Sequence, residues 1–210
     1  MIKVSDAQKI IRDNIKSLST ESINILESQN RVLAKNIFAK TSHPINDVSA
    51  MDGYALNVNV KDPSIHYDII GTSSAGDSNN LKIKKNQCVK IFTGGKLPDG
   101  ANTILIQEDA SFRDGKLFVK DIEINKHIRK KGQNFQNGDL ILKTPKKITY
   151  RDIGLIALDD RDTIAVYQKP KISILSNGDE ITFPGEKKNK GQFSSANGPA
   201  IASFVSGRGG

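Results

Sequence analysis

Between residues 40 and 139, short β-prone runs alternate with turns rich in Gly, Asn, Asp and Pro. This alternation is the strongest constraint on the fold, because such runs bounded by turn residues are typical of strands. Arg113-Asp114-Gly115 adds a tight hairpin signal. We therefore expect an irregular β-rich domain over residues 40–139. Its expected strands cover 54–60, 67–71, 88–92, 103–107, 116–119 and 139–142.

The segments that flank this domain have helical spacing. Ser5 and Gln8 form a capping-box pattern ahead of apolar residues at helical spacing, which predicts a helix of about three to four turns. Its apolar stripe should pack on a downstream segment or on a second subunit. A second helix is expected over 148–158, with Thr149 as its N-cap. Shorter elements are expected as strands at 23–26 and 163–167, and as a helix or turn at 31–34. Together, residues 1–39 and 140–170 predict a discontinuous helical and extended linker domain.

After Pro170 the pattern changes again. An apolar strand is expected at 171–175, followed by a polar loop at 176–180. Asn197 or Gly198 can then cap a helix that has Pro199 in its first turn. A strand, a loop and a capped helix open a parallel α/β unit, which needs more strands than 171–210 can supply. We expect an incomplete α/β domain here; the alternative is a small appendage on the β-rich part. The fold class is then α+β and mostly β.

Composition limits the classes of function. The 210 residues carry a net charge of +8 with a pI near 9.5, which favours anionic partners. The chain has no Trp and sparse aromatic residues, so we expect no nucleic-acid partner. No apolar run approaches the roughly 18 residues of a membrane span, and no secretory signal layout is present. Cys88 is the only cysteine, which leaves no internal disulfide and no zinc-site spacing. These features predict a cytoplasmic protein without membrane partners.

Three loops have the chemistry of an anion and metal site. Asp52 lies beside Gly53 where a turn meets a strand, Thr93-Gly94-Gly95 offers a hydroxyl and backbone N–H donors, and Asp179-Glu180 follows a predicted strand. Oxygen ligands suit Mg²⁺, and a nest of N–H groups suits an oxyanion. Each loop taken alone is equally typical of a structural turn. The basic cluster at 126–131 is likewise open between a solvated face and an anion-attracting patch.

Taken together, these stretches resemble one known family. Asp47-Val48-Ser49-Ala50-Met51-Asp52-Gly53-Tyr54-Ala55 is similar to the signature of the molybdopterin molybdenumtransferases, the MoeA and gephyrin E-domain family. Three other stretches match the same family in the same order. They are 91–102 with Gln107-Glu108, 128–134, and 174–181 with 184–185, 191–192 and 195–197. The resemblance covers essentially the whole chain and corresponds to the N-terminal half of family members.

The resemblance implies a reaction and a site. Family members insert molybdate into adenylylated molybdopterin and release AMP, with Mg²⁺ present, and work as homodimers on this small polyanionic substrate. Their cleft lies between the MogA-like, molybdopterin-binding α/β domain of one subunit and the β-rich domain of the other. The matching catalytic residues are Asp52, Thr93 and Glu180, with Asp52 and Glu180 also as metal ligands. The matching cofactor-binding residues are Ser49, Met51, Gly94, Gly178, Asp179 and Asn197.

This sequence also departs from the family pattern. Gln133 and Asn134 stand where the family usually has Glu and Asp, and Asn177 replaces a Ser or Thr. The family's later Gly-rich and Pro-Gly loops, which hold the pterin, are not in the sequence. We therefore expect that this chain is a fragment that is inactive alone. The alternatives are a non-catalytic dimeric scaffold of the same family and a basic nucleic-acid binder.

Overall fold

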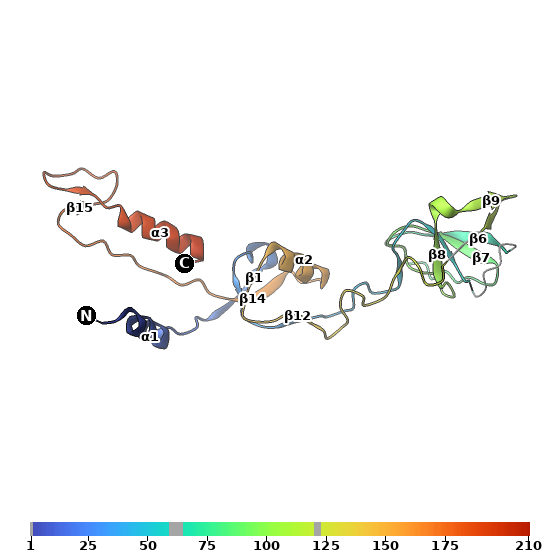
Figure 1. Ribbon diagram of the computed structural model, residues 1–210, viewed down its shortest axis with the longest axis horizontal. Coiled ribbons are helices and arrows are strands. Elements are labelled where there is room, and N and C mark those ends of the chain that lie inside the picture. Colours follow the sequence, from blue (N-terminus) through green and yellow to red (C-terminus); the bar gives the residue numbers. More distant parts are fainter. Residues whose placement is uncertain (1, 59–64, 120–122) are drawn as a thin grey trace. The chain divides into compact units, whose positions relative to one another are not determined.

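A computed structural model describes residues 2–58, 65–119 and 123–210 (Figure 1). The chain divides into two compact units. Unit 1 comprises Met1–Ile37 and Ile141–Gly210, and unit 2 comprises Phe38–Leu140. The division falls within β3 (Ile37–Phe38) and β12 (Leu140–Leu142). Over the described residues the structure is mostly β with three α-helices, which confirms the expected fold class. The expected domain boundaries and the α/β domain at 171–210 stay predictions.

Unit 2 is built on a six-stranded sheet with the order β8-β5-β7-β6-β10-β9. The strands are β5 (Gly53–Leu56), β6 (His66–Ser73), β7 (Gln87–Ile91), β8 (Thr103–Ile106), β9 (Ser111–Arg113) and β10 (Lys116–Phe118). All four residues of β5 are buried, because it lies between β7 and β8 and its two faces enter different apolar clusters. Tyr54 and Leu56 join one cluster and Ala55 the other. The start of β5, at Gly53, is therefore a stiff support for the residue before it.

Most strands of unit 2 lie where the sequence predicts them. The Asp114-Gly115 turn is confirmed: both residues have positive φ, and the turn joins β9 to β10. The expected strand at 54–60 is shorter, since β5 ends at Leu56, and its positions 59–60 lie outside the described residues. Two short strands were not predicted from the sequence. They are β4 (Val48–Ser49) and β11 (Ile128–Arg129), which pair with each other. A 3₁₀ helix, η2 (Gln107–Asp109), follows β8.

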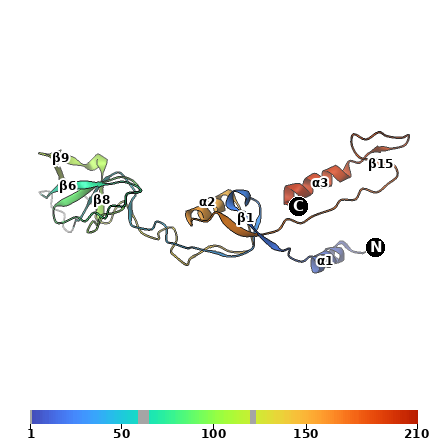
Figure 2. The same cartoon turned by 180° about the vertical axis from the view of Figure 1, so that it is seen from behind.

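Unit 1 contains a four-stranded sheet with the order β1-β14-β2-β13. Its strands are β1 (Thr20–Asn24), β2 (Val32–Leu33), β13 (Lys146–Lys147) and β14 (Thr163–Tyr167). The helix α2 (Tyr150–Leu158) and the 3₁₀ helix η1 (Ile25–Glu27) pack beside this sheet (Figures 1 and 2). Ile156 of α2 joins Leu33 and Val166 of the sheet in one buried cluster. The expected helix or turn at 31–34 is wrong: β2 forms there because Leu33 pairs with Val166 and Lys146.

Two of the helix caps expected from sequence have opposite outcomes. Thr149 is confirmed as the N-cap of α2, with a capping box to Asp152. Asp152 also receives Lys146 Nζ at 2.6 Å. Ser5 is not a cap: α1 (Val4–Asn14) begins after Lys3, which makes no side-chain capping bond. No residue of α1 is buried, so its expected apolar stripe is exposed in this structure.

The C-terminal segment holds β15 (Ile181–Thr182) and β16 (Phe193–Ser194), which pair in parallel, and the helix α3 (Asn197–Arg208). The expected strand at 171–175 is wrong, because no described segment pairs with it and four of its five residues are exposed. The expected cap of α3 shifts as well: the N-cap is Ala196, and Ser195 Oγ accepts from Gly198 N at 3.3 Å. Among the described residues, no helix is long and apolar enough to cross a membrane.

Candidate functional site in the loops of unit 2

Asp52 is fixed by the loop that follows β7. Its Oδ1 accepts from the backbone N of Thr93 at 2.7 Å and from Thr93 Oγ1 at 2.8 Å. Its backbone O accepts from Gln107 N at 3.0 Å, at the end of β8. Three segments far apart in sequence therefore meet at Asp52, one at its carboxylate and one at its backbone carbonyl. Because β5, β7 and β8 are neighbours in the sheet, their ends hold these loops together.

Ser49 joins the Asp52 loop to the Gly-Gly loop. Its buried hydroxyl donates to Met51 O at 2.5 Å and accepts from Met51 N at 3.2 Å, which closes the turn before Asp52. Its backbone N donates to Gly95 O and its backbone O accepts from Gly94 N, both at 2.9 Å. A Cβ on Gly95 would lie 2.7 Å from Ser73 O, so only glycine permits the loop to lie this close to Ser73. Ser49, Met51 and Gly94 thus lie together with Asp52 and Thr93.

The expected oxyanion nest is not formed by the Gly-Gly loop. The N–H of Thr93 donates to Asp52, that of Gly94 to Ser49, and that of Gly95 to Phe92 O at 2.8 Å. All three donors are used to bind the loops to one another. The physical reason is that an exposed carboxylate and two loop carbonyls compete for them locally. The loop therefore contributes rigidity and the Thr93 side chain, and the expectation of free N–H groups for an anion is corrected.

The electrostatics of the site keep Asp52 ionised. The backbone N–H and the side-chain hydroxyl of Thr93 hold the pKa of Asp52 below its ordinary value, and Lys90 on β7 adds to this lowering. Asp52 is exposed, and within the described part of the chain its Oδ2 accepts no hydrogen bond. One carboxylate oxygen is thus fixed by Thr93, and the other is left without a hydrogen bond from the described residues, on an exposed residue.

A second carboxylate organises the basic segment beside this site. Asp47 Oδ2 accepts from Lys130 Nζ and Oδ1 from the backbone N of Lys131, both at 2.8 Å. Burial alone would raise the pKa of Asp47, but these bonds outweigh it and hold the pKa below the ordinary value. Ala50 N donates to His127 O at 2.8 Å, just before β11. The strand β11 and the basic residues after it are therefore tied to the same loop that presents Asp52.

Sequence reasoning gave no role to two residues of this region. In the sequence, Asp47 is part of a family motif and Lys90 is part of a predicted strand, and neither pattern indicates a role in the site. Asp47 acts on residues 83 and 84 positions away, and Lys90 acts on Asp52 across the sheet. Lys90 pairs with Tyr54, two positions after Asp52, and this register cannot be read from the sequence of β7 alone.

The remaining predicted site residues lie in unit 1. Gly178 has φ of +154°, and a Cβ there would lie 2.7 Å from the carboxylate oxygens of Glu180. The backbone O of Asp179 accepts from Gln192 Nε2 at 2.9 Å. Asn197 is the first residue of α3. The structure thus gathers Ser49, Met51, Asp52, Thr93 and Gly94 in unit 2, and places Gly178, Asp179, Glu180 and Asn197 in unit 1.

The donor set of unit 2 can be tested against a divalent cation. Mg²⁺ in proteins is commonly held by one or two carboxylates together with substrate phosphates and waters. Asp52 fits such a role because it is ionised and exposed, and one of its oxygens accepts no hydrogen bond from the described residues. Among the described residues, no group of three or more His, Cys, Asp or Glu side chains comes together.

Comparison with known proteins decides the family. The family model of the MoeA N-terminal region (domain I and II) matches residues 2–158. The chain belongs to the MoeA family. This confirms the family resemblance, and the matched range contains residues 47–55, 91–102 and 128–134.

The relatives agree with this membership. The chain is 29% identical over 180 residues to a molybdopterin molybdenumtransferase of Haemophilus influenzae, covering 85% of this chain and 45% of the relative. It is 26% identical over 216 residues to one of Nostoc sp., covering 98% and 49%. The chain thus spans about half the length of these curated relatives.

Solved structures show the same fold. A molybdopterin biosynthesis MoeA protein from Pyrococcus horikosii superposes with a TM-score of 0.88 at 24% identity, over 100% of this chain and 55% of that one. At that identity the likeness shows the fold alone. The fold seen here is therefore the one that MoeA proteins adopt over this part of their length.

Proposed function

We propose that this chain takes part in molybdenum cofactor biosynthesis, as the N-terminal part of an enzyme that inserts molybdate into adenylylated molybdopterin and releases AMP. Its relatives are named molybdopterin molybdenumtransferases, which supports this transferase class. The observation that carries the proposal is the state of Asp52. It is an ionised carboxylate fixed through one oxygen by Thr93, and it lies within the stretch that the family model matches.

The residues of unit 2 have clear roles under this proposal. Asp52 would hold Mg²⁺ through Oδ2, and the bound metal would polarise the phosphate being cleaved. Thr93 orients the carboxylate and keeps it charged. Ser49 and Met51 form the turn that sets the position of Asp52, and the backbone N–H of Gly94 donates to Ser49 O. Lys90 and the basic segment after β11 would attract a polyanionic substrate.

Further parts of the proposal concern segments and partners outside unit 2. Gly178, Asp179, Glu180 and Asn197 would bind the pterin substrate, and Glu180 would be a second metal ligand. The site would be completed by a second copy of the protein in a homodimer. The protein would act in the cytoplasm, without nucleic-acid or membrane partners. These statements rest on family membership together with the residues that match the family motifs.

A chimera tests the proposed reaction. Residues 1–180 of this chain are joined to the remaining half of the Haemophilus influenzae relative, and AMP release is measured with adenylylated molybdopterin, molybdate and Mg²⁺. We expect activity, and we expect Asp52→Ala to reduce it by about 10²–10³-fold, as loss of a charge-stabilising group does. The matched control is Asp68→Ala, which removes an exposed carboxylate on β6 of the same unit. An Asp52→Ala chimera as active as the Asp68→Ala chimera would refute the assignment.

One observation favours a second candidate function, a non-catalytic dimeric scaffold. Asn134 stands where the family usually has a carboxylate, and its Oδ1 accepts from Arg129 at 3.4 Å while its backbone N donates to His43 O. These contacts give Asn134 a structural role in the basic loop. A chimera that forms a stable dimer but releases no AMP would support the scaffold. Recovery of activity by Asn134→Asp would instead show that the amide only weakens an enzyme.

A further inference from the structure

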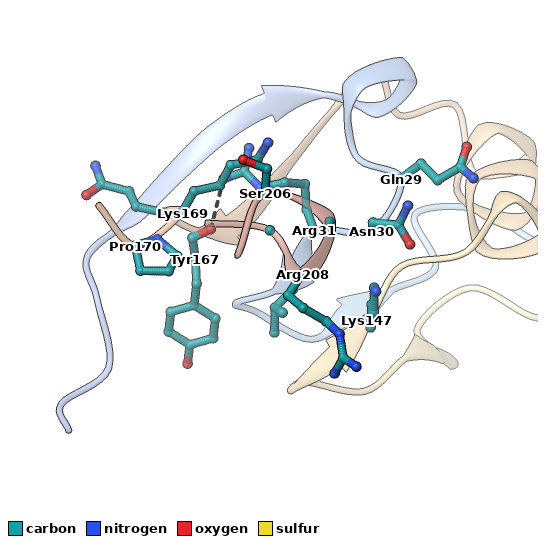
Figure 3. A pocket seen from close by; sticks show the side chains of 13 residues that line it. Gln29, Asn30, Arg31, Lys147, Tyr167, Lys169, Pro170, Ser206 and Arg208 are labelled. Carbon is teal, nitrogen blue, oxygen red and sulfur yellow. Dashed lines mark hydrogen bonds between the residues drawn. The ribbon is translucent and has the colours of Figure 1, made fainter. Parts of the chain in front are cut away.

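Unit 1 contains a cavity of about 330 Å³ that is separate from every residue discussed above as a site residue. Its walls come from four segments: the loop before β2, the end of β13, the chain after β14 and the last turn of α3 (Figure 3). The lining residues are Gln29–Val32, Lys147, Tyr167–Pro170 and Ser206–Gly209. The volume is in the range of small-molecule sites.

The lining of this cavity carries charge of one sign. Arg31, Lys147, Lys169 and Arg208 all contribute to it, and none of its thirteen lining residues is Asp or Glu. Arg31 is paired with Glu21, which lies outside the lining, so the uncompensated charge comes from Lys147, Lys169 and Arg208. These three cations repel one another, and an anion between them relieves that repulsion. Polar groups of Gln29, Asn30 and Ser206 add hydrogen-bonding capacity to the same walls.

The side chain of Arg31 is anchored in the wall of the cavity. Its guanidinium pairs with Glu21 on β1 and donates to Tyr167 O at 2.9 Å, and its side chain is only 12% exposed (Figure 3). Arg31 N donates to Ser28 O, so the backbone is held as well. A guanidinium anchored in this way presents its remaining N–H groups in a set direction, which suits recognition of a planar or tetrahedral oxyanion.

The partial negative charge at the C-terminus of α3, which would oppose an anion, is reduced. The carbonyls of Val205 and Ser206 accept from the N–H groups of Gly210 and Gly209, which satisfies them within the turn. Arg208 lies over the ring of Phe204 at 4.8 Å, so its guanidinium is supported at the wall. The positive side chain therefore dominates the charge at this end of the cavity.

We propose that this cavity binds a phosphate group, either as the free oxyanion or carried by a small molecule. Arg31 would set the orientation, and Lys147, Lys169 and Arg208 would neutralise the charge. All residues of this phosphate site lie in unit 1, and its binding of phosphate is independent of the proposed reaction. Recognition of phosphate by arginine forks and lysine ammonium groups is the chemistry that such a lining provides.

Titration of the 210-residue chain with inorganic phosphate, followed by amide NMR at constant ionic strength, tests the proposal. We expect saturable shifts at residues 30–32, 147, 168–169 and 207–209, and none in unit 2. The double variant Lys147→Gln/Arg208→Gln should weaken phosphate binding by at least about tenfold. Both side chains are exposed, so the fold should persist, and the spectrum itself reports this.

The matched control is Lys35→Gln/Lys190→Gln, which removes the same net charge from exposed positions of unit 1 outside the cavity. An equal loss of binding in this control would overturn the proposal, as would equal shifts with chloride or shifts without saturation. A second arm uses AMP and adenosine. Tighter binding of AMP than of phosphate would assign a carried phosphate group, and weaker or equal binding a free oxyanion. Binding of adenosine as tight as that of AMP would contradict the site.

Discussion

Asp52 and Glu180, which the family pattern assigns to one reaction, lie in loops of opposite character. Asp52 receives two hydrogen bonds from Thr93, and its loop is joined through Ser49 to the Gly-Gly loop above a packed sheet. Glu180 lies in an exposed loop, and within the described residues its carboxylate has no hydrogen-bond or ion partner. The difference teaches that a carboxylate is held in one position where hydrogen-bond donors from distant segments converge on it. A neighbouring glycine in the loop does not by itself fix the position of a carboxylate.

The largest effect expected from this comparison is at Gly53, the support beneath Asp52. A Cβ there would lie 1.9 Å from Leu105 O, a backbone atom that cannot move away cheaply. Gly53→Ala should therefore lower the free energy of unfolding of unit 2 by about 3 kcal/mol, measured by urea denaturation. The control is Gly71→Ala on β6, whose Cβ would meet Leu81 at an ordinary 3.6 Å. Equal stability of the two variants would show that β5 is not the rigid support described here.

An intermediate loss of folding stability is expected when the cap of α2 in unit 1 is removed. Thr149→Ala removes the hydroxyl that bonds to Asp152 and should lower the free energy of unfolding by about 1 kcal/mol. Ser5→Ala should have almost no effect, because Ser5 caps nothing. Urea unfolding followed by circular dichroism compares the two variants. A larger loss in Ser5→Ala than in Thr149→Ala would contradict the local structure of unit 1.

Asp152 adds a pH dependence to the same helix. Burial alone would raise its pKa, but Lys146 and Thr149 outweigh this and hold the pKa below the ordinary value of 3.8. The carboxylate therefore stabilises unit 1 above pH 3.8, and this contribution is lost as pH falls through the lower folded pKa. Lys146→Met should reduce the stability lost between neutral and acidic pH. An unchanged pH profile would mean that the ion pair contributes nothing.

The smallest effect is expected at the exposed carboxylates of the C-terminal loop. Asp179→Asn and Glu180→Gln should each change the free energy of unfolding by less than about 0.5 kcal/mol, because neither side chain is packed or bonded in the described structure. Thermal melts of both variants beside the parent chain measure this. A clear destabilisation would show that this loop is organised as tightly as the loop of Asp52.

Local patterns predicted the parts of this structure that depend on neighbours in sequence. The Asp114-Gly115 hairpin and the Thr149 cap are local, and both formed as expected. The strand expected at 171–175 needs a partner strand, and no strand in the described part of the chain pairs with it. The pattern at Ser5 was correct for a cap, but the helix begins at Val4.

In the candidate site, too, local motifs were predictable and contacts between distant segments were not. Family motifs located Asp52 and Thr93, but the bonds between them join residues 41 positions apart and could not be read from either loop. For the same reason Asp47 and Lys90 had no predicted role. The free N–H nest was wrong because the sequence does not reveal that Ser49, Asp52 and Phe92 take up those donors.

The central claim is that Thr93 holds Asp52 as an ionised ligand. It is tested most directly by following the carboxyl carbon of Asp52 by NMR as a function of pH. We predict a pKa below the ordinary value of 3.8 in the parent chain, because both groups of Thr93 donate to Oδ1. Thr93→Val should raise this pKa part of the way, since the backbone N–H still donates, and Thr93→Ser should leave it low. A parent pKa at or above 3.8, or no change in Thr93→Val, would contradict the claim.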